Sequence, residues 1–361
     1  MTRVLAVLKR CVCLVAMAGG LVAGIASAAD GPAVASDYNP YPGPSRWGPT
    51  DEAGASNTQT PAKVLEAKRL IKQGIVYDLG HTYKPAMPMF PGNFGLAIDP
   101  KPVQHLAQQI LNTEMLHGEI TQMGTQFDAL GQAGILSPHS SALSDALYYN
   151  QWTGAEVIGA DGLLRRLGVE NVKPFVTRGV LLDIRRYANG GRRMEPGQEV
   201  TLAMIRQTLT AQRMTEDDIR EGDVLLFVTG WEDKWDSPDN GYYVTPGIGL
   251  AAPGLGFEAA KWAASRKVAC VGADNWGLEV SPPKPPVTPE VLFPVHHHLL
   301  VKHGIYMHES LKLAALADDL ACEHATNPPE LGGAAYEFFY AYNPVSIKGT
   351  SGSPGAPIVI R

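Results

Sequence analysis

The segment QMGTQFDALGQ, residues 122–132, places three amides and one carboxylate at an even spacing. Gln122, Gln126, Asp128 and Gln132 are separated by four, two and four residues. Successive side chains alternate between the two faces of an extended chain, so in a strand all four would point the same way. A helix would carry Asp128 well away from the face of Gln126. The spacing therefore predicts a strand-like segment that directs three amides and one carboxylate toward one place.

A second polar cluster lies in FPVHHHLLVKHGIYMHES, residues 293–310. Its three consecutive histidines cannot all face one way, so at most one or two would serve a common site. Glu309 follows the short apolar run GIYM, which is typical of a strand. A histidine run by itself is more often exposed to solvent than ligating. A histidine and Glu309 that converge with Asp128 would instead form a natural set of divalent-metal ligands.

The elements between these clusters alternate in type. Short apolar runs of the buried-strand type occupy residues 179–184, 223–231 and 267–274, and helical patterns occupy 60–74, 201–214 and 254–266. This alternation predicts an α/β fold with a mostly buried sheet. No repeat or linker divides the chain, so we expect one domain over residues 29–361 with an irregular N-terminal arm over 29–62. The loops 232–247 and 323–334 have the composition of surface insertions. The Gly-rich run 247–256 lacks the spacing of a phosphate loop, so it does not indicate a nucleotide site.

Residues 1–28 have the organisation of a secretory signal peptide. A basic start is followed by an apolar run and by Ala26-Ser27-Ala28, so we expect cleavage after Ala28 and a periplasmic or secreted protein. An uncleaved membrane anchor is the alternative. Removal of the three positive charges takes the formal net charge from −6 to −9. This charge argues against nucleic acid or an anionic membrane surface as a partner.

Two cysteines remain after that cleavage, Cys270 in an apolar run and Cys322 in a helical pattern. We expect them to be unlinked core-type residues rather than a disulfide pair. Neither belongs to a motif for a metal or a nucleophile.

Together these segments resemble the Putative cyclase and kynurenine formamidase-like metal hydrolases, a family that includes isatin hydrolase. The family pattern His-x-Gly-Thr-His-x-Asp-x-Pro-x-His lies over residues 122–132. The segments YDLGH, MFPG, GVLLDI, VLLFVTGW, VGADNWGLEV and KGTSGSPGAPIVI follow the family's order from about residue 45 to the end.

The resemblance implies a swivelling β/β/α fold with a mixed sheet, assembled as a homo-oligomer, with one or two divalent ions in a pocket that takes a small-molecule substrate. It assigns residues to three roles. The metal ligands fall on Gln122, Gln126, Asp128, His297 and Glu309, with His296 as the rival of His297; the proton-transfer histidine falls on Gln132; and the substrate pocket is lined by Phe90, Trp231 and Trp276.

The chain departs from the family pattern at its glutamines. A branch of the family reads Gly-Thr-Gln, and Gln122 with Gln126 resembles that branch. Amide oxygens bind metal more weakly than imidazole and tilt the preference from Zn²⁺ toward Mn²⁺, Mg²⁺ or Ca²⁺. The family resemblance and this tilt together make Zn²⁺ or Mn²⁺ the expected cofactor. Gln132 cannot titrate, so it can orient a water but cannot accept its proton. His117 and His139 are the candidates to replace that base.

Three functions fit the sequence. The first is an exported metal-dependent hydrolase of a small amide or lactone, impaired at Gln132. The second is a periplasmic small-molecule binding protein with a retired catalytic site, and the third is a structural or interaction protein that uses only the fold. Metal content separates the first from the third, and turnover separates the first from the second.

Overall fold

The computed structural model describes residues 38–361 apart from 94, 102–103, 285–287, 289–290 and 327–335. Contacts group Asn39–Arg361 into one unit. The expected signal peptide and the first part of the N-terminal arm lie outside the described residues. No helix in the described part of the chain is long and apolar enough to cross a membrane.

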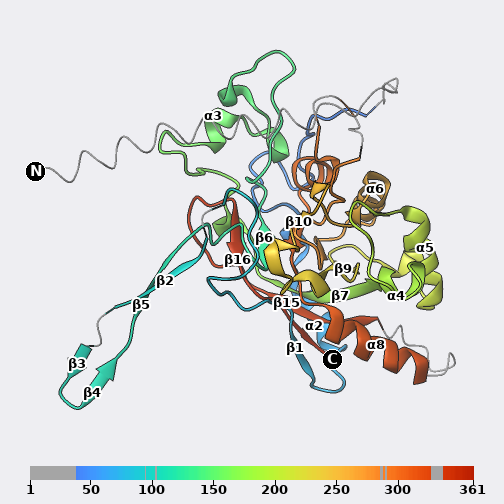
Figure 1. Ribbon diagram of the computed structural model, residues 1–361. Coiled ribbons are helices and arrows are strands. Elements are labelled where there is room, and N and C mark those ends of the chain that lie inside the picture. Colours follow the sequence, from blue (N-terminus) through green and yellow to red (C-terminus); the bar gives the residue numbers. More distant parts are fainter. Residues whose placement is uncertain (1–37, 94, 102–103, 285–287, 289–290, 327–335) are drawn as a thin grey trace, which may run out of the picture. The chain divides into compact units, whose positions relative to one another are not determined.

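A nine-stranded mixed sheet forms the centre of this unit (Figure 1). Its spatial order is β1, β17, β15, β7, β9, β13, β14, β6 and β16. The strands span β1 Val76–Asp78, β6 Gln126–Asp128, β7 Phe175–Asp183, β9 Val224–Val228, β13 Cys270–Ala273, β14 Tyr306–Glu309, β15 Glu337–Tyr342, β16 Gly352–Pro354 and β17 Ile358–Ile360. The central strands β7, β9, β13 and β14 run parallel, and the strands flanking them pair antiparallel.

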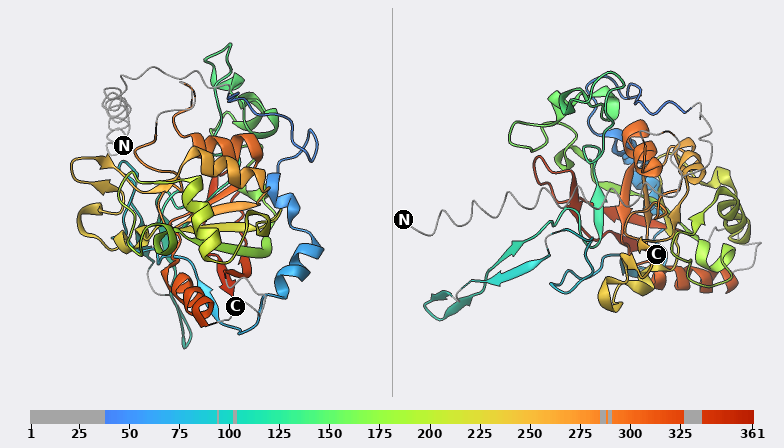
Figure 2. Two further views of the ribbon diagram at one scale, coloured as in Figure 1. Left: turned by 90° about the vertical axis from the view of Figure 1, so that its right-hand side faces the viewer. Right: turned by 45° about the horizontal axis from the view of Figure 1, so that its top comes forward.

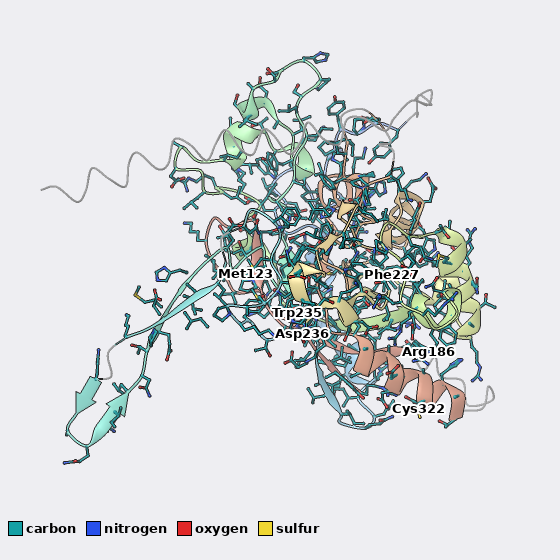
Figure 3. The ribbon with its side chains drawn as sticks, in the orientation of Figure 1. Met123, Arg186, Phe227, Trp235, Asp236 and Cys322 are labelled. Atoms are coloured by element: carbon teal, nitrogen blue, oxygen red, sulfur yellow. The ribbon has the colours of Figure 1, made fainter. Side chains whose placement is uncertain are left out.

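The apolar runs of the sequence form the middle of this sheet. Every residue of β9 and β13 is buried, as expected for parallel strands covered on both faces, and Phe227 lies within β9 (Figure 3). The α/β fold with a mixed, mostly buried sheet is thus confirmed. The expected strand 223–231 ends early, because Gly230 adopts a φ of 83° and the 3-10 helix η7 (Trp231–Lys234) begins there.

Threonine side chains cap the starts of two helices. Thr60 and Thr201 accept backbone hydrogen bonds from Lys63 and Met204, and each precedes its helix directly. The helices are α2 Pro61–Lys68, α3 Gly154–Val157, α4 Ile184–Ala188, α5 Leu202–Ala211, α6 Phe257–Ser265, α7 Pro294–His296 and α8 Ala314–Thr326. The helix expected over 60–74 therefore ends six residues early.

Two expected surface insertions have more structure than predicted. Residues 323–326 belong to α8, whereas 327–334 lie outside the described residues. The loop 232–247 contains η7, the 3-10 helix η8 (Pro238–Asn240) and β10 (Val244–Thr245), which pairs with β11 (Gly249–Leu250). Cys322 is exposed on α8 (Figure 3) and Cys270 is buried in β13. Both are free, as expected, but the expectation of a core position is wrong for Cys322.

A two-stranded hairpin extends away from the large sheet in both Figure 1 and the right-hand view of Figure 2. Its base pairs β2 (Ala97–Pro100) with β5 (Glu114–His117), and its tip pairs β3 (Gln104–Leu106) with β4 (Gln109–Leu111). A further parallel pair joins β8 (Glu199–Val200) to β12 (Gly254–Leu255).

Candidate metal centre and substrate cavity

Strands β6 and β14 bring the first polar cluster against the second. They pair antiparallel, with Glu309 opposite Gln126. Nε2 of Gln126 donates a hydrogen bond to Oε2 of Glu309 at 2.9 Å. Asp128 lies two residues further along β6, so its side chain shares the face of Gln126. The pairing of these strands thus places two buried carboxylates side by side.

Gln122 and Gln132 join this cluster by turns rather than by an extended chain. Nε2 of Gln122 donates to Oδ1 of Asp128 at 3.1 Å, and Nε2 of Gln132 donates to Oε1 of Gln122 at 3.1 Å. The predicted convergence of the four side chains is confirmed, but the prediction of one continuous strand is wrong, because β6 covers only three residues. Gly124 makes the first turn possible: its φ is 60°, and a Cβ there would lie 2.6 Å from the ring of Tyr83.

The two glutamines predicted as metal ligands act here as hydrogen-bond donors. Gln126 donates to Glu309 and Gln122 donates to Asp128 through their amide nitrogens. A ligand role for either residue would require its amide to turn, so that the oxygen rather than the nitrogen faces the carboxylates.

His296 brings an imidazole to the carboxylates. It ends the short helix α7, and its Nε2 lies 3.4 Å from Oε1 of Glu309. His297, the residue that the sequence favoured for this role, begins the π-helical turn η9 (His297–Lys302), and its Nε2 lies 2.5 Å from the carbonyl oxygen of Pro40. Consecutive residues on a helix point about 100° apart, so only one of the pair can face the carboxylates. The assignment of His297 is corrected to His296.

Asp128, His296 and Glu309 form a set that could hold a metal ion. One ligand atom from each lies within 4.8 Å of the other two. Oδ2 of Asp128 and Oε1 of Glu309 are buried and have no hydrogen-bond partner. Unpartnered carboxylate oxygens are costly in a protein interior, and one imidazole with carboxylates is a common ligand set for Zn²⁺ or Mn²⁺. The residues present therefore fit a divalent ion.

The electrostatics of the cluster agree with this fit. Burial, followed by the charge of Glu309, raises the pKa of Asp128 to about 8. Burial alone would lower the pKa of His296, but its contacts with Glu279 and Glu309 raise that pKa well above the ordinary value. The negative charge of Glu309 contributes to both shifts, in addition to burial at Asp128 and to Glu279 at His296. A divalent cation would supply the opposing charge.

Glu279 is a site residue that the sequence reading missed. Its Oε2 lies 2.9 Å from Nδ1 of His296, and its Oε1 accepts a hydrogen bond from the backbone N–H of Val295 at 3.1 Å. A carboxylate on the far nitrogen of a metal-binding histidine fixes the orientation of the ring. The only sequence signal was its place in the family-like segment VGADNWGLEV, which gave it no role.

A cavity of about 990 Å³ opens beside this cluster. Phe90, Tyr243 and Trp276 form one aromatic wall, with ring centroids 5.5–5.9 Å apart. Phe90 and Trp276 therefore line the cavity as the resemblance implied. Trp231 does not: it is fully buried, donates from Nε1 to the carbonyl oxygen of Tyr242 at 2.9 Å, and belongs to the apolar cluster against which Phe90 and Trp276 pack. Tyr243 takes its place in the wall.

The cavity wall is apolar and acidic. Among the residues that the structure describes, it carries no lysine or arginine, and its ionisable members include Glu119, Glu279 and Glu309 together with His296 and His297. The apolar members besides the aromatic wall include Ile135, Leu136, Val280, Val291, Leu292 and Phe293. The raised pKa of His296 makes this imidazole the cation that an anionic substrate would meet on the described part of the wall.

The position of the family's proton-transfer histidine is occupied by an amide. Gln132 lines the cavity, and its Oε1 is buried without a hydrogen-bond partner. The two histidines considered as replacements do not line the cavity: His117 lies on the exposed hairpin with Nε2 3.3 Å from Asp99, and His139 is exposed. Neither can act as the base in this arrangement.

Comparisons with known proteins agree on one family. The family model described as "Putative cyclase" matches residues 77–280. A crystal structure described as a novel cyclase is 27% identical, with a TM-score of 0.72 over 87% of this chain and 96% of that chain. No curated protein matches the chain.

Two isatin hydrolases share the fold at lower identity. Isatin hydrolase A from Labrenzia aggregata, bound to benzyl benzoate, is 18% identical, with a TM-score of 0.54 over 81% of this chain and 94% of that chain. Isatin hydrolase A from Ralstonia solanacearum is 19% identical, with a TM-score of 0.53 over 84% of this chain and 98% of that chain. The cyclase-type fold implied by the resemblance is confirmed, and the chain belongs to the Putative cyclase family.

Proposed function

We propose that this protein is a metal-dependent hydrolase of an uncharged aromatic or cyclic amide or lactone, with chemistry like that of the kynurenine formamidases. The observation that carries the proposal is the buried set of Asp128, His296 and Glu309, whose unpartnered oxygens lie beside a large aromatic cavity. The isatin hydrolases with the same fold support it, although a shared fold by itself does not decide a reaction.

Zn²⁺ or Mn²⁺ would be held by Asp128, His296 and Glu309. Such an ion polarises a carbonyl group and lowers the pKa of a bound water. Around it, Glu279 holds the ring of His296 in place, and the amides of Gln122 and Gln126 hold the two carboxylates.

The cavity wall selects the substrate class. The rings of Phe90, Tyr243 and Trp276 offer apolar faces and edges for an aromatic substrate. Outside the candidate metal centre the described wall carries Glu119 and apolar groups but no lysine or arginine, so a free carboxylate on the substrate would find no cation to pair with there. An uncharged ring that carries a formamide or belongs to a lactone fits this environment.

In the proposed reaction the oxygen of water adds to the substrate carbonyl carbon, and the C–N or C–O bond to the leaving group breaks. The proton released by the water finally resides on the leaving nitrogen or oxygen. Oε1 of Gln132 can accept a hydrogen bond from the attacking water and orient it, but it cannot take the proton. We therefore expect slow turnover.

Metal analysis of the purified protein, combined with a substrate panel, tests the proposal. The panel pairs an aryl formamide and an aryl lactone with analogues that carry a free carboxylate. We expect about one divalent ion per chain and turnover of the neutral members. Bound metal with no turnover would favour the binding-protein alternative. The structural argument for that alternative is Gln132, whose amide cannot accept a proton from water. A protein without metal affinity would rule out the hydrolase.

We also propose that the protein is exported. The support is the basic start, apolar run and Ala26-Ser27-Ala28 of the sequence. N-terminal sequencing of protein from the cell envelope fraction should find Ala29 first. Recovery of chains that begin at Met1 in the cytosol would contradict export.

A further inference from the structure

One wall of the cavity comes from the N-terminal arm. Tyr41 lines the cavity between two buried prolines, Pro40 and Pro42. It lies more than 200 residues along the chain from His296, which lines the same cavity. The arm has no regular secondary structure at this point, so other groups must hold Tyr41 in place.

Two side chains of the turn η9 hold the arm. Nζ of Lys302 donates to the carbonyl oxygens of Asn39 at 2.6 Å and Tyr41 at 2.9 Å, and Nε2 of His297 lies 2.5 Å from that of Pro40. Three successive backbone carbonyls are therefore bound by one element. Because its Nε2 contacts the arm, His297 lies next to the set of Asp128, His296 and Glu309 but is not part of it.

We propose that Tyr41 is a specificity-determining residue, whose ring contacts the distal apolar part of an extended, uncharged aromatic substrate. The inference rests on the proposed function, which defines the group of the substrate that reacts. The arm is the basis for the part of the substrate that lies away from that group. A cavity of about 990 Å³ is at the upper end of the range for small-molecule sites, so it has room for more than one ring. The arm contributes Tyr41 to it, and η9 holds the backbone that carries this residue in advance of binding.

Binding of two neutral probes tests the inference. Formanilide has one ring, and 4-phenylformanilide adds a second ring in line with the first. We expect Tyr41→Ala to weaken binding of the two-ring probe by about two- to tenfold, the range of one aromatic contact, and to change formanilide binding less than twofold. Tyr41→Phe should bind both probes like the wild type. Calorimetry on the full chain, with and without Mn²⁺, measures these affinities independently of turnover.

Lys302 is a positioning residue, and its variants test the anchoring of the arm. Lys302→Met should speed hydrogen exchange in the peptide 39–46 and weaken binding of the two-ring probe, whereas Lys302→Arg should restore both. Lys261→Met, on an exposed lysine of α6, is the matched control and should change neither. Slow exchange and unchanged affinity in Lys302→Met would show that the arm does not depend on this anchor and would overturn the positioning role of Lys302.

The outcomes separate this inference from the proposed function. If the wild type hydrolyses formanilide but Tyr41→Ala keeps the wild-type affinity ratio of the two probes, the role of Tyr41 is wrong and the hydrolase stands. If the wild type binds the two-ring probe in a Tyr41-dependent way without turnover, the hydrolase is wrong and the role of Tyr41 stands. Failure of the wild type to bind 4-phenylformanilide would overturn the extended substrate class.

Discussion

Nδ1 of His296 lies 2.9 Å from a carboxylate oxygen of Glu279, while Nε2 of the same ring faces Glu309 at 3.4 Å. The ring is thus held between two buried carboxylates. Glu279 orients the ring, and Glu309 belongs to the candidate metal centre. Glu279 also accepts the backbone N–H of Val295, so the loop that carries it is joined to the start of α7. This arrangement presents Nε2, rather than Nδ1, to the candidate metal centre.

Replacement of Glu279 should weaken metal binding without removing a ligand. Loss of a carboxylate behind a metal-binding histidine typically costs about 10- to 100-fold in affinity or activity. We expect Glu279→Ala to weaken Zn²⁺ or Mn²⁺ binding in that range, and Glu279→Gln, which keeps an oxygen acceptor, to lose less. Calorimetric titration of metal into each variant measures the effect. Equal affinity in wild type and Glu279→Ala would show that the His296 ring is oriented by other contacts.

Removal of Asp128 should abolish metal binding. Asp128→Asn keeps the shape of the side chain but removes the charge of a fully buried ligand. We expect elemental analysis to find no bound metal in this variant, and any hydrolysis to be lost with it. His303→Ala is the control, because His303 contacts His298 rather than the carboxylates, and it should keep the wild-type metal content. Equal metal content in Asp128→Asn and wild type would contradict the assigned centre.

Gln132→His should raise the hydrolytic rate. A positioned general base is worth about 10² to 10⁴ in rate, and Gln132 already faces the cavity. The neutral imidazole is the base, so the rate of this variant should rise with pH between about 5 and 8, where histidine loses its proton. His117→Ala and His139→Ala should leave the wild-type rate unchanged, because neither residue lines the cavity. A loss of rate in either would identify a base that this arrangement does not show.

The expected homo-oligomer remains a prediction, and the projecting hairpin is where we expect its subunits to meet. Ile98 and Leu116 pair across β2 and β5, and they are 41% and 60% exposed. A two-stranded ribbon is marginally stable when neither face is covered. We expect a mass above that of one chain by light scattering, and a shift toward the monomer in Leu116→Lys. Leu143→Lys, at an exposed leucine outside the hairpin, is the control. A wild-type protein with the mass of a single chain by light scattering would contradict this prediction.

The sequence by itself determined the type of fold and the chemical character of the site. Apolar runs of strand length can be satisfied only by burial on both faces, so they predicted the centre of the sheet around β9 and β13. Helical patterns over 60–74 and 201–214 predicted α2 and α5, and in the structure a threonine side-chain oxygen satisfies a free backbone N–H at the start of each helix. Residues 122–132 and Glu309 could be recognised as polar groups for one site, since their types suit a metal.

Only the tertiary structure decided which of these groups meet. The choice between His296 and His297 depends on the rotation of a short helix, which neighbouring elements set. Glu279, Tyr243 and Tyr41 reach the cavity from segments whose local sequence carries no sign of it. Trp231 has the same residue type as Trp276, yet it is buried behind the wall. Such positions are fixed by packing between segments that are far apart in the chain. The local pattern of a sequence does not encode that packing.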